Sequence, residues 1–192
     1  MTFHFGSNLK NPSKSDYLEV MSQVASTVSV IASNGPAGLA GLTVSSLTSV
    51  SADCANPVIL VCINKSSRAG SVIVKNGAFS ANILHEGQTA IADMFSGRTD
   101  KQGRDRFDQD NWSFAPQDAP ALDGALAILR CVIRSSVRVG SHQVIFGAVE
   151  QIDFGSRSSP LIYLNRGYGS VSEFVNKPQQ AMAVDDRIGN DR

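Results

Sequence analysis

The stretch that decides the fold reads Gly41-Leu42-Thr43-Val44-Ser45-Ser46-Leu47-Thr48-Ser49-Val50-Ser51, and it is followed by Val58-Ile59-Leu60-Val61-Cys62-Ile63-Asn64-Lys65-Ser66-Ser67-Arg68. The first part is dense in hydroxyl groups, which both donate and accept hydrogen bonds. The second part is an apolar run that ends in amides, hydroxyls and two cations. Because nothing polar interrupts the run from Val58 to Ile63, it predicts a strand that is buried on both faces.

A buried strand that emerges into donors and positive charge suits an anionic ligand with a polar heterocycle. Hydroxyls and amides would meet the ring edge, and cations with oriented N–H groups would meet a phosphate. The alternative is a Ser/Thr-rich strand pair joined by a turn, with Lys65 and Arg68 solvated on a loop. Composition alone favours this alternative, so the ligand site needs further support.

The bulk composition indicates one globular domain. The chain has 192 residues, of which 42% are hydrophobic and 18% charged, enough for one substantial core. Seventeen basic residues balance seventeen acidic ones, which argues against nucleic acid or a membrane as a partner. No apolar run could span a bilayer, and the first eight residues do not resemble a secretory signal. Cys54, Cys62 and Cys131 are far apart and indicate small apolar residues in a reducing cytoplasm.

The pattern along the chain predicts strands with a few helices. One helix is expected after an N-cap at Ser15, with an apolar face made by Tyr17, Leu18, Met21, Val24 and Ala25. Other helices are expected over 69–75 and 88–95, and strands over 27–32, 78–84, 126–139, 143–154 and 160–164. Residues 100–111 predict an exposed loop. The expected organisation is a flexible lead over 1–12, a domain over 13–176 and a disordered tail over 177–192.

Several chemistries have no sequence signature in this chain. There is no G-x-G-x-x-G after a strand, no G-x-x-x-x-G-K-[ST] and no G-x-S-x-G, so a Rossmann site, a P-loop and a hydrolase elbow are not expected. His4, His85 and His142 share no metal-ligand spacing with each other or with a cysteine. No metal site is therefore predicted.

Two further places carry candidate ligand residues: a tight turn between two long strands that contains His142, and the loop after the last strand, with Tyr163, Arg166 and Tyr168. The simpler interpretation of His142 is a turn histidine exposed to water. The simpler interpretation of the loop is an aromatic core residue beside a solvated arginine. Gly167 and Gly169 would allow this loop to approach a ligand closely.

Together these elements resemble the flavin reductase family with the FMN-binding split β-barrel, the reductase components of two-component flavin-dependent monooxygenases. The resemblance spans roughly Tyr17 to Phe174 and rests on four elements in order: Gly41 to Ser51, Asn56 to Arg68, Gly140-Ser141-His142, and Pro160-Leu161-Ile162-Tyr163 with Arg166 and Tyr168. It implies a mainly β, single-domain split barrel that forms a homodimer. It also implies binding of FMN or FAD, hydride transfer from NADH or NADPH to that flavin, and supply of reduced flavin to a separate oxygenase.

The resemblance also implies roles for particular residues. Flavin binding is expected of Thr43, Val44, Ser45, Ser46, Ser49, Asn64, Lys65, Ser66, Ser67 and Arg68. Nicotinamide binding is expected of His142, Tyr163, Arg166 and Tyr168. Relatives usually carry Gly-Asp-His where this chain has Gly140-Ser141-His142, so the group that orients the histidine must come from another partner here.

Two weaker resemblances concern the middle of the chain. Phe95-Ser96-Gly97 are similar to a helix end that packs near the flavin, although a core phenylalanine is the simpler interpretation. A charged loop of the family resembles the segment with Lys101, Arg104 and Arg106 before Phe107, with solvated charge as the alternative.

No general acid or base is predicted, because the flavin takes the hydride directly and the fold has only to stack two rings. The alternative function is a non-enzymatic flavin-binding or electron-relay protein on the same barrel. His142 and the Arg166-Gly167-Tyr168 loop favour the enzyme. A sheet-mediated assembly protein without a ligand is a third and weaker interpretation.

Overall fold

A computed structural model describes residues 11, 13–53, 55–108, 112–114, 118–155 and 157–172. The predicted lead (residue 11 apart), the predicted tail and Cys54 lie outside the described residues. The helices are α1 (Lys14–Ser22), α2 (Arg68–Asn76) and α3 (Thr89–Ser96), with 3-10 helices η1 (Glu86–Gln88) and η2 (Gly103–Arg106). The strands are β1 (Ser26–Thr27), β2 (Ser29–Ser33), β3 (Ala40–Val44), β4 (Thr48–Ser51), β5 (Val58–Asn64), β6 (Ala78–Ile83), β7 (Trp112–Ser113), β8 (Ala121–Leu122), β9 (Ala127–Val139), β10 (His142–Phe154), β11 (Ile162–Leu164) and β12 (Gly167–Gly169).

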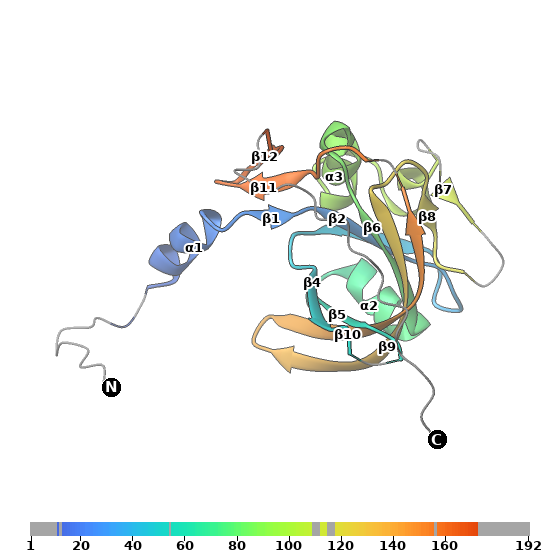
Figure 1. The fold of residues 1–192 in the computed structure, drawn as a ribbon. Helices are drawn as coiled ribbons and strands as arrows, with labels where there is room; N and C mark the ends of the chain where they lie inside the picture. Colours follow the sequence, from blue (N-terminus) through green and yellow to red (C-terminus); the bar gives the residue numbers. More distant parts are fainter. Residues whose placement is uncertain are drawn as a thin grey trace, which may run out of the picture.

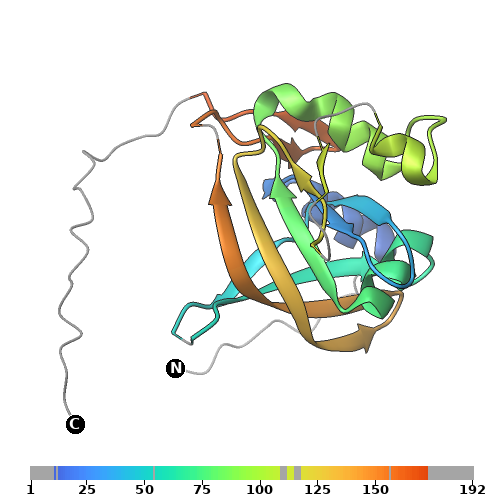
Figure 2. The same ribbon diagram turned by 90° about the vertical axis from the view of Figure 1, so that its right-hand side faces the viewer.

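A curved antiparallel sheet of seven strands dominates the fold, in the order β3-β2-β6-β9-β10-β5-β4 (Figure 1, Figure 2). Within the described residues the two end strands, β3 and β4, are not paired with each other, so the barrel remains split. Two smaller sheets complete the fold, β1-β11-β12 and β7-β8. The predicted mainly β split barrel is confirmed, and the predicted helices at 69–75 and 88–95 correspond to α2 and α3.

The two longest strands form a hairpin with a two-residue turn. Gly140 lies in the left-handed region with φ 54°, which a glycine adopts without strain. His142 is the first residue of β10 and pairs with Val139. The prediction that His142 belongs to the turn was therefore wrong by one position, because the turn contains only Gly140 and Ser141.

Strand β5 corrects a second prediction. Its side chains alternate, with Ile59, Val61 and Ile63 buried and the opposite face only half-buried. The continuous apolar run therefore does not mark a strand buried on both faces. The opposite face, with Val58, Leu60 and Cys62, is only partly covered.

The core consists of two clusters on the two faces of β2. Val28, Val30 and Ala32 pack with α3 and with an aromatic group formed by Phe95, Phe107 and Trp112. Ile31 packs on the other side with α2, β5 and β10. Because both faces of β2 are covered, all five of its residues are buried. Figure 1 shows α2 within the space that the curved sheet surrounds.

Helix α1 differs from its prediction in two ways. Ser13 is the N-cap, because its side chain accepts a hydrogen bond from the N–H of Asp16, so the cap is not at Ser15. No residue of α1 is buried, and Tyr17, Leu18 and Met21 are 60%, 50% and 44% exposed. The helix extends away from the barrel (Figure 1), so its apolar face has no partner among the described residues.

The segment predicted as an exposed loop over 100–111 contains η2 and a buried anchor. Phe107 is only 3% exposed and packs edge-on against Phe95, with ring centroids 4.9 Å apart. Charge density predicted the exposed part of the segment but not the aromatic side chain that fixes it to the core. Residues 109–111 lie outside the described part of the chain.

Candidate functional site

The loop from β5 to α2 is ordered by its own side chains. Asn64 Oδ1 accepts hydrogen bonds from the backbone N–H and the hydroxyl of Ser66, at 3.0 Å and 2.8 Å. Ser67 caps α2, because its Oγ accepts from the N–H of Gly70 at 3.2 Å. Other N–H groups in the first turn of a helix have no acceptor inside the helix. The loop therefore presents backbone donors beside Arg68, the first residue of α2.

Gly70 sets the position of this helix terminus. A Cβ atom on Gly70 would lie 2.5 Å from Cγ2 of Ile63, closer than packed carbon atoms approach. The absence of a side chain lets α2 lie directly against β5. The backbone of the first turn of α2, which carries Arg68, is thereby held at a defined place relative to the sheet.

Two adjoining cavities lie beside the first turn of α2. One, of about 360 Å³, is lined by Gly41 and Thr43 of β3, by Ser67 and Arg68, and by Ser96 and Arg106. The other, of about 450 Å³, shares Gly41, Arg68 and Arg106 and adds Val72. Both volumes are typical of small-molecule sites. Two arginines and no acidic residue line these cavities, which favours an anionic ligand.

A third cavity, of about 180 Å³, adjoins the first at Thr43 and Ser96 and is aromatic. Its wall includes Tyr163 and Tyr168, whose rings are steeply inclined to each other with centroids 5.6 Å apart. Arg98 lies over the ring of Tyr168 at 5.5 Å and forms an ion pair with Asp93 at 3.0 Å. The site thus changes from cationic to aromatic across β3.

The surroundings of Tyr168 favour its neutral form further. Burial raises the pKa of its phenol, the Asp93 carboxylate raises it further, and Arg98 opposes the change. The hydrogen bond to Asp93 raises the pKa of Arg98 in turn. The cavity therefore presents a neutral ring that a guanidinium holds from one side.

The predicted hydroxyl donors have partners within the protein. Thr43 Oγ1 donates to the carbonyl of Ala92 at 2.7 Å, which ties β3 to α3. Ser46 Oγ donates to the carbonyl of Cys62 and accepts from its N–H, at 3.1 Å and 2.9 Å. Thr43, Val44 and Ser45 still line the cavities. Ser46 and Ser49 line none of the three.

His142 lies on the other side of the β5–α2 loop. It pairs with Asn64 across the β10–β5 ladder, and the N–H of Lys65 donates to the carbonyl of Ser141 at 3.0 Å. The hydroxyl of Ser141 lies 3.0 Å from Nδ1 of His142. The partner that the sequence left open is thus Ser141 itself, which replaces a charged partner by a neutral one. His142 is exposed and does not line the three cavities.

Arg166 was predicted to bind nicotinamide, but it does not line any of the three cavities. It has a positive φ of 61° and pairs with Glu19 of α1 at 2.8 Å. The neighbouring Asn165 donates its N–H to the carbonyl of Ser22 at 2.7 Å. The β11–β12 turn therefore holds α1, while Tyr163 and Tyr168 of the same hairpin line the aromatic cavity.

Residues that the sequence did not place in the site come from the end of α3 and from η2. Ser96 lies in the segment whose Phe95 was interpreted more simply as a core residue, and Arg106 in the segment interpreted more simply as solvated charge. Phe95 is indeed a core residue at 2% exposure. Arg98 was missed entirely. The available signal was its position directly after Gly97, which ends α3 in the left-handed conformation with φ 82°.

Comparison with known proteins assigns the chain to a family. Residues 21–172 match the model of the flavin reductase like domain. The chain is 41% identical over 152 residues to the FMN reductase (NADH) RutF of Methylorubrum extorquens, covering 79% of this chain and 72% of that protein. This protein belongs to the flavin reductase family, as the sequence predicted.

Solved structures agree with that assignment. A flavin reductase structure from Haemophilus somnus has 30% identity and a TM-score of 0.77, covering 83% of this chain and all of the other. A homologue of nitrilotriacetate monooxygenase component B from Mycobacterium thermoresistibile has 27% identity and a TM-score of 0.76, covering 87% of this chain and 91% of the other. In the described part of this chain, no helix has the length and apolar character needed to cross a membrane.

Proposed function

We propose that this protein transfers a hydride from NADH to FMN. The broader class, an NAD(P)H:flavin oxidoreductase, is confirmed by family membership and by the name that its relatives carry. That name, FMN reductase (NADH), supports FMN over FAD and NADH over NADPH. The use of FAD or NADPH stays a prediction.

The observation that carries the proposal is the meeting of cationic and aromatic cavities at β3. A flavin nucleotide has an anionic phosphate at one end and a flat ring with polar edges at the other. Arg68, Arg106 and the free N–H groups of α2 fit the phosphate. The backbone of Thr43 to Ser45 fits the ring edge, and Tyr163 and Tyr168 offer faces for stacking.

The chain contributes binding and orientation. A bound flavin supplies the hydride acceptor, so the protein needs no acid or base of its own. Tyr168, kept neutral, can stack on a ring and exclude water from it. His142, oriented by Ser141, lies across the loop from the phosphate site and is proposed to position the nicotinamide.

A direct test is anaerobic reduction of flavin. Purified protein is mixed with NADH or NADPH and with FMN, FAD or riboflavin in turn, and the visible flavin absorbance is followed. We expect the fastest bleaching with NADH and FMN. Flavin that binds but is not reduced by either donor would contradict the proposal and support the electron-relay alternative.

We also propose that the protein forms a homodimer. The exposed apolar side chains of α1 support this, and so does the uncovered outer face of the β9–β10 hairpin, where Val137 and Val139 are 53% and 59% exposed. Contiguous exposed apolar surface typically marks an interaction site. The edge strands of a split barrel also gain from being covered.

The fate of the reduced flavin is part of the proposal. A solved relative is a homologue of component B of a monooxygenase, and another is the flavin reductase component of a two-component tryptophan halogenase. These names support delivery of reduced flavin to a separate oxygenase or halogenase. A cytoplasmic location remains a prediction; Cys62 and Cys131 are free thiols.

A further inference from the structure

A separate cavity of about 420 Å³ lies on the opposite flank of α2, between this helix and the β9–β10 hairpin. We name it the hairpin groove. Its floor is apolar and is formed by Ile63, Val74 and Ile145. Its rim carries the cationic side chains of Lys65, Lys75 and Arg138.

The charges of the hairpin groove are uncompensated. No acidic residue lines it. Among the described residues, the ion pairs involve Arg98, Arg130 and Arg166 and none of the three rim cations. Three cations around one cavity raise its affinity for a polyanion. Ile63 and Ile145 are buried in the floor, so the apolar surface open to a planar group comes from Val74.

The hairpin groove and the flavin cavities lie on either side of one helix turn. Arg68 and Val72 of α2 line the flavin side, whereas Val74 and Lys75 line the hairpin groove. Asn64 and Lys65, at the end of β5, belong to the rim of the groove and lead directly to Arg68. His142 pairs with Asn64 at the same place. A ligand that crosses this loop can therefore contact both sites.

We propose that the hairpin groove binds the phosphorylated adenosine end of a dinucleotide. The rim cations would meet the diphosphate, and Val74 would support the adenine. The polar edge of the adenine would meet the amide groups that Asn64 and Gln143 have left, since Asn64 Oδ1 accepts from Ser66 and Gln143 Nε2 donates to Ser136. FAD and the nicotinamide dinucleotides share this end. The inference rests on the proposed function, which supplies the reason for a dinucleotide at this place.

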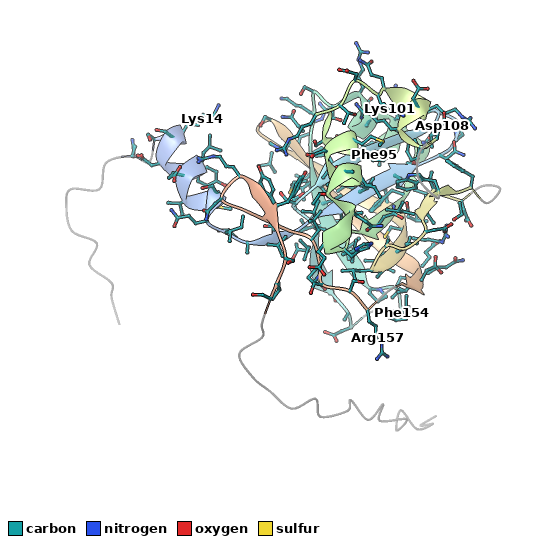
Figure 3. All side chains as sticks on the ribbon, turned by 90° about the horizontal axis from the view of Figure 1, so that it is seen from above. Lys14, Phe95, Lys101, Asp108, Phe154 and Arg157 are labelled. Carbon is teal, nitrogen blue, oxygen red and sulfur yellow. The ribbon has the colours of Figure 1, made fainter. Side chains whose placement is uncertain are left out.

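The test compares two charge-matched double variants. Lys75→Gln/Arg138→Gln removes two rim cations and leaves Lys65 in the flavin loop intact. The control Lys14→Gln/Arg157→Gln removes the same charge from positions that do not line the groove (Figure 3). ADP binding is measured by calorimetry, KM for NADH and for reduced nicotinamide mononucleotide by steady-state kinetics, and Kd for FAD and FMN by fluorescence.

We expect the groove variant to weaken ADP binding by about tenfold, since two exposed charge-assisted contacts are lost. If KM rises to the same extent for NADH but not for the mononucleotide, the groove binds the adenosine end of the hydride donor. If Kd rises for FAD but not for FMN, the groove binds the adenosine end of FAD. The control should resemble the parent in every measurement.

Unchanged ADP, NADH and FAD constants in an enzyme that still reduces flavin would overturn the groove assignment and leave the proposed function intact. An equal loss in both double variants would also overturn it, because the effect would then be one of net charge. If the parent reduces no flavin, the proposed function fails. In that case, if the parent binds ADP and the groove variant does not, the groove is still supported as an adenosine nucleotide site.

Discussion

At the scale of single residues, Arg68 begins α2, and its side chain lines two cationic cavities. Arg68→Ala should raise the Kd for FMN by about tenfold, because a charge-assisted contact to phosphate is lost at a partly exposed site. Riboflavin has no phosphate and should bind the variant and the parent equally. Flavin fluorescence titration measures both. Arg157→Ala is the control, and an unchanged FMN titration in Arg68→Ala would remove the loop from the flavin site.

The contact between Ser141 and His142 predicts a second residue effect. His142→Ala should bind flavin normally but lower kcat/KM for NADH by about a hundredfold, because a misplaced reacting ring costs on this order. Ser141→Ala should have a smaller effect in the same direction, since the ring keeps its place in β10 but loses its partner. Stopped-flow reduction of bound flavin measures hydride transfer separately from flavin binding. If His142→Ala reduces bound flavin at the parental rate, this histidine has no role in positioning the nicotinamide.

Cys131 makes stability depend on pH. Burial raises the pKa of this thiol from 9.0 to about 12. The folded state thus holds a proton that the unfolded chain releases, so the stabilisation is complete below pH 9 and is lost as pH rises toward 12. The unfolding free energy should fall there by up to about 1.4 kcal/mol per pH unit from this group. Urea unfolding of the parent and of Cys131→Ala measures the difference, and parallel pH curves would contradict it.

At the scale of elements, the close approach of α2 to β5 depends on Gly70. Gly70→Ala places a methyl group against Ile63 and should destabilise the fold by about 1–3 kcal/mol, as overpacking does in other cores. The displaced helix should also weaken FMN binding. Ser71→Ala, at an exposed position of the same helix, is the control. A melting temperature equal to that of the parent would show that α2 can shift without cost.

How far the elements follow from sequence depends on whether their signals are local. Helix α2 was predictable because Ser67 and Gly77 mark its two ends, and the β9–β10 hairpin because Gly140 separates two long strand-like segments. The burial of Phe107 could not be predicted from local sequence, because its partners lie in α3 and β7. Long-range packing likewise decides that Tyr168 lines a cavity while Arg166, two residues earlier, pairs with α1.

At the scale of the whole molecule, the exposed apolar side chains of α1 predict a dimer. Light scattering should give twice the chain mass at concentrations where activity is full. Leu18→Glu/Met21→Glu should lower that mass to one chain, because it puts charge on the apolar helix face, where these two residues are 50% and 44% exposed. Lys14→Glu, on the same helix, is the control. A monomeric parent would contradict the dimer outright.

The pairing of β1 with β11 has a consequence for synthesis on the ribosome. It joins Ser26 to Tyr163, residues from nearly opposite ends of the described chain. The early segment therefore waits for its partner until the residues through Tyr163 have left the exit tunnel. Since Tyr163 also forms a wall of the aromatic cavity, a nascent chain has no complete binding site. Competence to bind the nucleotide thus arises only after the β11–β12 hairpin has been synthesised and has folded onto β1.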